Sequence, residues 1–430
     1  MGVAVEQARA GGTMSSMTQV SPADMMLAAA LVFGLATTCQ VIAPRLKIPA
    51  LILLLPVGFL FGLIAPDLRM DEILGSAFPV VVDLLVALIL FQGGMELGSI
   101  SLQGRDGNVV RKLIWIGGAI TFIGGSLASH FVLGLEWPLA FLLGAILIVS
   151  GPTVVTPILD LVRLKPRVRG ILLWEGTSLD PLGAIFAVVI FQIINASKAS
   201  STIEAIGTFF ASFVVAVVVA AAGVVLVVVG QKVVRPNHLL GTQVLIGSVI
   251  VVAGISNFIA QDSGLLAALL MGVASPRLAK RLNTSLDQVK PFFNTIASIG
   301  IGVLFISIAA LVPSPLVATI ALPAVGVALI LILVVRPLIA LVCTGKAGLS
   351  RKERAFIGWM DPRGIVAAAT ASSVGASLVA AKVPGADELL PAAFIIIAVT
   401  VFVYGLTAVP VAAVLGLRDS AADDEGPTPS

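Results

Sequence analysis

Eight ionisable residues lie inside long apolar stretches of this chain or near their ends. They are Asp83, Glu96, Asp160, Glu175, Asp180, Arg336, Asp361 and Arg363. A charge in such surroundings costs several kcal/mol unless it is paired or hydrated, so each residue is a candidate for binding or carrying an ion. A carboxylic acid there holds either a proton or a hard cation, because desolvation disfavours its bare charged form.

Asp180 is the strongest of these candidates. Its apolar stretch extends from about residue 168 to 193, which places the side chain too far from either end to reach water. Glu175 lies seven residues from the start of this stretch, and Arg363 lies eight residues from the start of a later stretch at about 355. Because the depths match, we predict a buried ion pair between Glu175 and Arg363, although Asp361 is also close to Arg363.

The other ionisable residues suggest different roles. Glu96, Asp160 and Arg336 lie close enough to the ends of their stretches to reach water, so we interpret them as structural or topological. We interpret Asp83, near the end of its stretch, as a helix-terminal or gating polar group rather than an ion carrier.

Two proline motifs interrupt apolar stretches in their middle. They are Ser150-Gly151-Pro152-Thr153-Val154-Val155-Thr156-Pro157 and Asp361-Pro362-Arg363-Gly364. Proline removes a backbone donor and clashes with the preceding turn, so both helices are expected to break inside the membrane. Two broken helices that run in opposite directions are typical of transporters built from inverted repeats, with the binding site at the crossing. Ordinary proline kinks are the alternative.

The elements that carry these motifs are membrane-spanning helices. Of the 430 residues, 58% are apolar and 11% charged, with a mean hydropathy of +1.10, which no water-soluble fold accommodates. A helix crosses a bilayer with about 20 apolar residues. The sequence predicts an all-α membrane protein with about 13 spans, near residues 25–43, 49–65, 78–98, 113–133, 138–160, 168–193, 206–229, 241–259, 264–275, 291–311, 316–343, 355–381 and 390–415.

The distribution of lysine and arginine tests this topology independently. Alternate loops, together with the tail, hold 20 basic residues, the other set holds 4, and only Arg336 and Arg363 lie within spans. Cytoplasmic loops carry the excess of basic residues, so we expect the amino terminus outside and the carboxyl terminus in the cytoplasm. Basic residues spread over loops in this way report topology, and no nucleic-acid partner is expected.

The spans divide the chain into repeats. We expect a flexible leader at 1–24, a membrane domain at 25–415 and a short cytoplasmic tail at 416–430. Within the domain, a first repeat covers about 25–193, a linker helix 206–229 and a second repeat about 241–415. Cys39 and Cys343 lie in apolar spans, and we interpret both as small buried hydrophobes.

The motifs resemble those of the monovalent cation/proton antiporters, in particular the NhaP-type sodium/proton branch with thirteen spans. Trp174–Ile185 (WEGTSLDPLGAI) is similar to the family segment whose Glu and ion-binding Asp lie five positions apart. The resemblance therefore implies these roles for Glu175 and Asp180.

Three further segments carry the resemblance. Gly358–Ala369 (GWMDPRGIVAAA) resembles the second broken helix of the family, which implies that Arg363 is the partner of Glu175. Ser150–Val155 (SGPTVV) resembles the first broken helix, and Leu88–Gly98 (LILFQGGMELG) resembles the glycine-rich end of an early span. A homodimer in the inner membrane and exchange of Na⁺, or of Li⁺ or K⁺, for H⁺ without a cofactor are the implied properties.

The chain also departs from the family pattern. Many relatives have Asp where this chain has Gly151, and Asn or Asp where it has Leu179. One hypothesis is that Asp361 replaces part of the missing charge; the other is that Asp361 caps the half-helix behind Pro362. Because Leu179 contributes no ligand, Ser178, Thr153 and backbone carbonyls near Ser150 are the expected neutral ligands of a metal ion at Asp180, Na⁺ for example.

A single carrier acid predicts exchange of one cation for one proton with no net charge moved. A channel or an organic-anion carrier that uses Arg363 as an anion clamp is one alternative. An intramembrane enzyme is another, but His130 and His238 are not placed to activate a mid-membrane serine, and Asp180 with Asp361 is the only candidate pair of catalytic acids. We therefore expect a transporter and not an enzyme.

Overall fold

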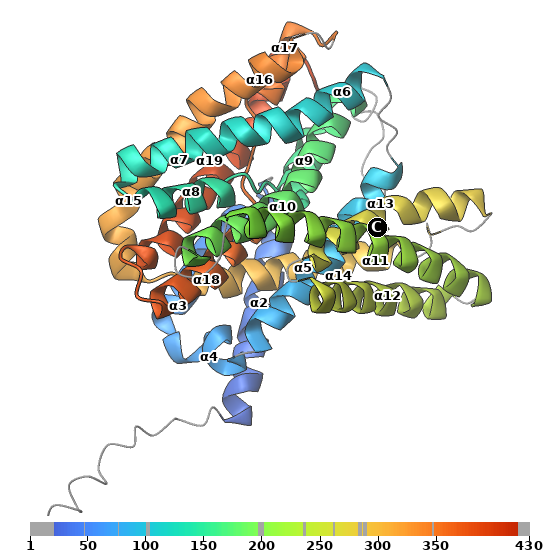
Figure 1. Ribbon diagram of the computed structural model, residues 1–430, viewed down its shortest axis with the longest axis horizontal. Helices are drawn as coiled ribbons and strands as arrows, with labels where there is room; N and C mark the ends of the chain where they lie inside the picture. Colours follow the sequence, from blue (N-terminus) through green and yellow to red (C-terminus); the bar gives the residue numbers. More distant parts are fainter. Residues whose placement is uncertain are drawn as a thin grey trace, which may run out of the picture.

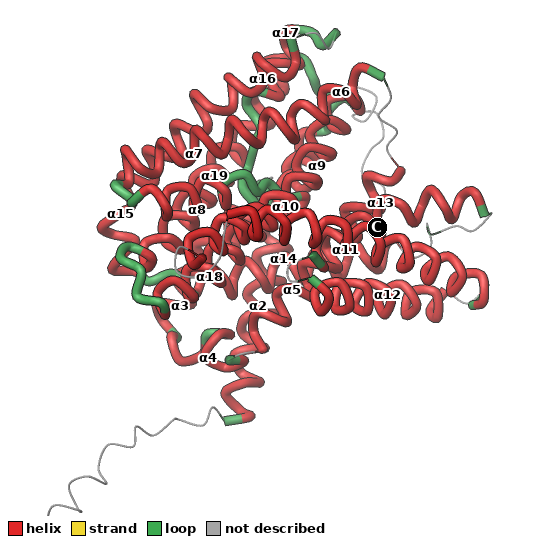
Figure 2. The backbone as a smooth tube through the Cα atoms, viewed as in Figure 1, coloured by secondary structure: helices red, strands yellow, loops and turns green. Residues whose placement is uncertain are grey.

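The computed structural model describes residues 21–419, with short gaps at 47, 76, 100–103, 197–201, 235–237, 261–262, 283–285, 287–289 and 346–347. These described residues form helices and no β-strand (Figure 2). Among them, nine helices are long and apolar enough to cross a membrane, and four more apolar helices are shorter. The predicted all-α membrane class is thus confirmed, and a helix is found within each predicted span.

The first described helix begins earlier than the sequence suggested. Ser21 caps α2, because its hydroxyl accepts from the Asp24 N–H at 3.1 Å and the Asp24 carboxylate accepts from the Ser21 N–H at 3.3 Å. The helix therefore begins at Pro22, inside the expected leader of residues 1–24, whose first 20 residues lie outside the described part. Of the expected tail at 416–430, only residues up to 419 are described.

The helices before the first break are α2 (Pro22–Arg45), α3 (Leu51–Ile64), α4 (Met70–Leu74), α5 (Ala77–Ser99), α6 (Arg105–Lys112) and α7 (Gly118–Leu133), with a 3-10 turn at Pro66–Leu68. Of these, α2, α3 and α4 lie in the lower part of Figure 1, α5 lies near its centre, and α6 and α7 extend along its upper part. Glycines bring α5 against a later helix, α13 (Gly264–Arg281). A Cβ on Gly94 would lie 2.6 Å from the Leu269 carbonyl oxygen, and one on Gly98 would lie 2.6 Å from that of Val273. The glycine-rich segment thus serves close helix packing.

The middle of the chain contains the first broken helix. Its halves are α8 (Trp137–Ile146) and α9 (Pro152–Val162), followed by α10 (Pro166–Ala196), α11 (Thr202–Val233) and α12 (His238–Ile259). Proline at position 152 starts the second half, where a missing N–H is harmless. In Figure 1, α10 extends across the middle of the molecule.

The last part contains the second broken helix. Its halves are α17 (Arg351–Ile357) and α18 (Ile365–Ala380), and the neighbouring helices are α14 (Lys290–Ala310), α15 (Ser314–Ile330), α16 (Arg336–Thr344) and α19 (Leu389–Leu415), with a 3-10 turn at Ala386–Glu388. Both predicted breaks are therefore present in the structure.

Two π turns interrupt helices that lie against each other. One, Leu113–Gly117, joins α6 to α7, and the other, Leu331–Val335, joins α15 to α16. A Cβ on Gly124 would lie 2.6 Å from the Val335 side chain, which shows how closely the two helices approach. A π turn changes which side chains face a neighbouring element, and Arg336 follows the second one directly.

Candidate functional site

Asp180 lies on α10 at the crossing of the two broken helices. Its side chain is fully buried. A Cβ built on Gly151 would lie 2.6 Å from Asp180 Oδ2, and one built on Gly364 would lie 3.6 Å from Asp180 Oδ1 and 2.9 Å from the Gly151 nitrogen. The two interrupted segments therefore meet backbone to backbone beside this carboxylate, and both contact positions are glycine.

The helix ends at the crossing have a definite polarity. Gly151 is the N-cap of α9 and Gly364 is the N-cap of α18, and neither has a side-chain cap. A helix N-terminus carries about half a positive elementary charge, so two such ends meet next to the Asp180 carboxylate. Asp180 is thus the side chain that offsets both ends. The prediction that Asp361 caps the half-helix behind Pro362 is wrong, because Gly364 holds that position without a cap.

Several buried oxygen atoms near the crossing have no hydrogen-bond partner within the described chain. They are both carboxylate oxygens of Asp180 and the hydroxyls of Ser150 and Thr153. Buried polar atoms are rarely left in this way, and each one requires an explanation. Carboxylate, hydroxyl and carbonyl oxygens are the donors that hard cations prefer, so this donor set suits a Na⁺-like ion as substrate.

Glu175 forms its ion pair with a different arginine from the one predicted. Its Oε1 and Oε2 accept from Arg336 Nη1 at 2.5 Å and Nη2 at 2.8 Å, and both side chains are almost fully buried. Arg336 Nε also donates to the Ile357 carbonyl at 2.8 Å, where α17 ends. The guanidinium therefore neutralises Glu175 and stabilises the C-terminus of a half-helix.

The predicted pair between Glu175 and Arg363 is consequently wrong, as is the interpretation of Arg336 as a residue that reaches water. Glu175 and Arg363 have similar expected depths along the membrane normal, but depth does not determine which helices are neighbours within the membrane plane. Arg336 lies seven residues from the end of its expected span at 343, so the same criterion could have found it.

Arg363 is paired with its neighbour Asp361. Arg363 Nη2 lies 2.9 Å from Asp361 Oδ2, and that oxygen lies 3.8 Å from Arg336 Nη1. Glu175, Arg336, Asp361 and Arg363 thus form one buried cluster without net charge, which we call the charge cluster. Because the Asp361 carboxylate faces two arginines, the structure gives no support to the hypothesis that it supplies charge to Asp180.

Two further acids of the sequence analysis, Glu96 and Asp160, lie near the ends of α5 and α9. Arg169 Nη2 lies 2.9 Å from Glu96 Oε1 and 2.8 Å from Asp160 Oδ1. This arginine connects three helices, and the structural interpretation of Glu96 and Asp160 agrees with these contacts. Both cysteines are buried and free, as expected for small hydrophobes.

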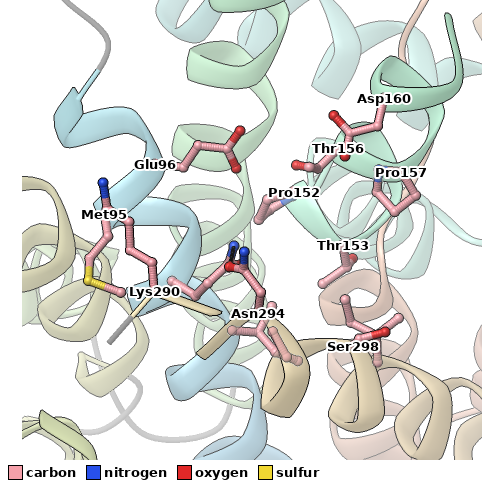
Figure 3. A pocket seen from close by; sticks show the side chains of 14 residues that line it. Met95, Glu96, Pro152, Thr153, Thr156, Pro157, Asp160, Lys290, Asn294 and Ser298 are labelled. Atoms are coloured by element: carbon pink, nitrogen blue, oxygen red, sulfur yellow. Dashed lines mark hydrogen bonds between the residues drawn. The ribbon is translucent and has the colours of Figure 1, made fainter. Parts of the chain in front are cut away.

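A cavity of about 400 Å³ approaches the crossing from this end. Figure 3 shows it between α5, α9 and α14, with Glu96, Asp160 and Lys290 at its polar part and Thr153 beside Pro152. Thr153 is two residues from Gly151, whose backbone touches Asp180. We call this space the Thr153 cavity.

One predicted ligand does not face the crossing, and one residue was missed. Ser178 is two positions before Asp180, about 200° around the helix, and so lies on another face. Thr177, three positions before Asp180, is buried on the same face, and its methyl would lie 3.4 Å from a Cβ on Gly93. The three-residue spacing between Thr177 and Asp180 was the sequence signal that both side chains lie on one face of the helix.

Comparison with known proteins shows the family to which the chain belongs. An all-helical membrane chain with a buried carboxylate between two broken helices defines a secondary transporter for ions. The profile of the family described as sodium/hydrogen exchanger, transmembrane, matches residues 28–414. The chain belongs to this family, whose members are transporters and not enzymes.

Curated relatives cover most of the chain. The Na⁺/H⁺ antiporter 1 of Methanocaldococcus jannaschii is 26% identical over 374 residues, which cover 83% of this chain and 85% of the relative. The K⁺/H⁺ antiporter NhaP of Alkalimonas amylolytica is 26% identical over 404 residues, which cover 91% of this chain and 67% of that protein. The resemblance to NhaP-type antiporters is confirmed, with relatives of both cation types.

A solved structure shares the fold. The sodium proton antiporter of Methanocaldococcus jannaschii at pH 8 superposes with a TM-score of 0.76 at 23% sequence identity, over 91% of this chain and 99% of that one. At this identity the likeness establishes the fold, and the roles of individual residues are argued from the present chain.

Proposed function

We propose that this protein exchanges a monovalent cation, Na⁺ or alternatively Li⁺ or K⁺, for H⁺ at Asp180. The observation that carries the proposal is a fully buried carboxylate whose two oxygens have no hydrogen-bond partner in the described chain, beside the crossing of two broken helices. Such an acid binds a proton or a cation, and binding of one excludes the other. Exchange is then obligatory, because the carrier returns only with one of the two bound.

Ser150 and Thr153 supply hydroxyl ligands in this proposal, and Thr177 takes the place first given to Ser178. Ser150 lies before Gly151 in the first broken segment, where backbone carbonyls are also released from helical pairing. The Ser150 carbonyl oxygen would lie 3.7 Å from a Cβ on Gly176, one turn before Asp180. The Asp180 carboxylate, these hydroxyls and the released carbonyls are oxygen ligands, which bind a small hard cation and not an anion.

The stoichiometry follows from the number of uncompensated acids. Glu175 and Asp361 are neutralised by two arginines, so Asp180 is the one buried acid at the crossing without a cationic partner among the described residues. One cation is exchanged for one proton, and the cycle moves no net charge. A transport current that reverses with membrane potential would contradict this.

Alternating access completes the mechanism. Thirteen crossings, arranged as two inverted repeats around α11, bring the two broken helices together in opposite directions, and one helix bundle moves against the other to expose Asp180 on each side in turn. A homodimer in the inner membrane is part of the proposal on the basis of family resemblance.

The proposed orientation is supported by contacts among basic loops. Arg167 forms an ion pair with Asp106 at 2.7 Å and donates a hydrogen bond to the Gly348 carbonyl at 3.1 Å. The backbones of Arg418 and Leu164 form an isolated antiparallel β-bridge. Four segments rich in lysine and arginine therefore lie at one end of the molecule. This end is cytoplasmic if the positive-inside rule applies, and the amino terminus is outside.

A channel or organic-anion carrier is the weaker alternative. It requires Arg363 as an anion clamp, but Asp361 lies 2.9 Å from that guanidinium. An anion would have to displace a buried carboxylate partner, at a cost of several kcal/mol.

The decisive experiment measures proton flux in proteoliposomes after addition of Na⁺, K⁺ or Li⁺. We expect Asp180→Asn to reduce exchange at least about 100-fold, because the amide neither releases a proton nor balances a cation, while unfolding temperature and detergent elution stay unchanged. Asp67→Asn, which removes a carboxylate outside the described lining of the Thr153 cavity, is the matched control that keeps pH-dependent exchange. Retained exchange in Asp180→Asn would reject the mechanism.

A further inference from the structure

A small buried space lies between the crossing and the charge cluster. It leaves about 10 Å³ for the centre of a water-sized sphere, so it admits one water molecule. Its lining comes from both broken segments and from α10, all of its described residues are buried, and it includes Ser150, Val155, Glu175, Gly176 and Asp361. We call this space the Gly176 cavity.

The cavity exists because residue 176 has no side chain. A Cβ built on Gly176 would lie 3.1 Å from Val155 Cγ2 and 3.7 Å from the Ser150 carbonyl oxygen, and both of these residues line the cavity. Glycine lowers the stability of a helix interior relative to alanine, so a glycine inside α10 calls for a packing or functional reason. Here it keeps a space open beside a hydroxyl and two carboxylates.

The Ser150 hydroxyl is a donor without an acceptor at this cavity. Ser150 is 1% exposed, and its Oγ has no hydrogen-bond partner within the described chain. A buried polar atom in this position requires an explanation, and an ordered water molecule is one. A hydroxyl has one hydrogen to donate and two lone pairs, so a serine that binds a cation through its oxygen still needs an acceptor for its hydrogen.

Two carboxylates of the charge cluster supply acceptors on the other side of the cavity. Each oxygen of Glu175 accepts one hydrogen bond from Arg336, and Asp361 Oδ2 lies 2.9 Å from Arg363 Nη2. An ionised carboxylate has about four lone-pair sites, so both acids can accept further hydrogen bonds. The lining thus offers one donor and two acceptor groups, and a buried water molecule requires two to four such partners.

A cation does not suit the Gly176 cavity. Arg336 and Arg363 already neutralise Glu175 and Asp361, so a cation there would face two guanidinium groups without an uncompensated acid. Like charges repel strongly in a buried, low-dielectric environment. The cavity therefore favours a neutral molecule that both donates and accepts hydrogen bonds, and water has the right size.

We propose that the Gly176 cavity binds one water molecule, which accepts a hydrogen bond from the Ser150 hydroxyl and donates to Glu175 and Asp361. The water directs the hydroxyl hydrogen toward the charge cluster and leaves the lone pairs of Ser150 Oγ for the cation at Asp180. The charge cluster thereby positions a ligand of the ion site without contacting the ion. This inference rests on the proposed function, in which Ser150 is a ligand.

The first test is a density map of the full-length protein at a resolution that shows ordered water. We expect a peak within about 3.2 Å of Ser150 Oγ and of a carboxylate oxygen of Glu175 or Asp361. A map that shows ordered water elsewhere in the protein interior but none in this cavity would overturn the proposal.

The second test compares the unfolding temperatures of Gly176→Ala and Gly176→Ser. Both variants add the same Cβ and displace the water, but only serine brings a hydroxyl in its place. Helix propensity favours alanine, whereas the proposal predicts that Gly176→Ser unfolds about 2 °C or more above Gly176→Ala. The same pair at Gly247, where an added Cβ meets nothing within 4 Å, is the control, and alanine should be at least as stable there. Alanine as stable as serine at position 176 would overturn the proposal.

The third test measures Na⁺-driven proton flux in proteoliposomes. We expect Gly176→Ala to raise the apparent KM for Na⁺ about 3-fold with the maximal rate nearly unchanged, and Gly176→Ser to raise it less. In a Ser150→Ala background, Gly176→Ala should have no further effect, because the water acts through that hydroxyl. Effects that multiply independently would overturn the positioning role. If Asp180→Asn is inactive and Gly176→Ala keeps the wild-type KM, the water site fails and the proposed exchange stands.

Discussion

Two acids on α10, five residues apart, have opposite surroundings. Glu175 accepts two hydrogen bonds from Arg336 and belongs to a charge cluster without net charge. Asp180 is equally buried, yet its oxygens have no hydrogen-bond partner in the described chain, and only two helix N-termini offset its charge. A compensated acid is a fixed structural element, whereas an acid without a counter-ion is available to exchange one ion for another.

The charge cluster also explains how the site is held together. Arg336 connects α16 to α10 through Glu175 and to the end of α17 through the Ile357 carbonyl. Asp361 continues the contacts to Arg363, whose N–H donates to Thr400 of α19 at 3.2 Å. The second broken helix is therefore anchored to three neighbouring helices by polar contacts while its glycine touches the crossing. The charge cluster therefore fixes α10 at Glu175, while Asp180 on the same helix is available to bind an exchangeable ion.

Breaking the charge cluster should give the largest change in stability. Arg336→Met leaves Glu175 buried without its partner, which costs roughly 3–5 kcal/mol of unfolding free energy. The double variant Glu175→Gln, Arg336→Met removes both charges and should recover more than half of the lost stability. Thermal unfolding in detergent, followed by circular dichroism, measures the difference.

A stable single variant would contradict this comparison, because it would mean that the cluster is hydrated or replaceable. A double variant no better than the single one would mean that Arg336 acts mainly through the end of α17. Asp180→Asn provides the contrast within the same helix, since it removes a charge that no side chain balances and should not lower the unfolding temperature.

A smaller effect is expected from filling the contact between the broken helices. A Cβ at Gly364 would lie 2.9 Å from the Gly151 nitrogen, so Gly364→Ala must move one segment away from the other. Displacement of reacting groups by about 1 Å costs on the order of 100-fold, and we expect the maximal exchange rate to fall about 10-fold to 100-fold. Initial rates of Na⁺-driven proton flux in proteoliposomes test this.

The control for that variant is Gly247→Ala on α12, where an added Cβ meets nothing within 4 Å. It should keep the wild-type rate and gain slightly in helix propensity. Equal rates in both variants would show that the close approach at the crossing has no part in exchange.

Much of the fold could be predicted from the sequence, because apolar length and proline are local signals. A helix lies in each predicted span, and both interruptions occur at the expected motifs. Gly151, Pro152 and Gly364 were identified by sequence, and the structure explains two of them by backbone contact at Asp180. Helix boundaries at Pro22 and the π turns were not predictable, because they depend on capping and on helix-to-helix packing.

The charge cluster was less predictable than the carrier acid. Asp180 was recognised from depth alone, since an acid in the middle of a span has few structural roles. The partner of Glu175 depended on which helices are neighbours, and depth could not distinguish Arg336 from Arg363. The prediction of Ser178 as a ligand considered its hydroxyl group but not its position around the helix. The helical repeat places Thr177, and not Ser178, on the face of α10 that carries Asp180.

The smallest effect, and the most specific test of the comparison, concerns pH. If H⁺ and the cation compete for Asp180, raising the pH lowers the apparent KM for Na⁺, by at most about tenfold per pH unit, and leaves the maximal rate unchanged. The slope of log KM against pH then approaches −1 in the acidic range and never exceeds it, because one proton is displaced. The double variant Glu175→Gln, Arg336→Met should keep this slope, since the neutralised cluster exchanges no proton. A slope steeper than −1 in the wild type, or loss of the slope in that variant, would mean that Glu175 also binds an exchangeable proton. The contrast between Glu175 and Asp180 would then fail.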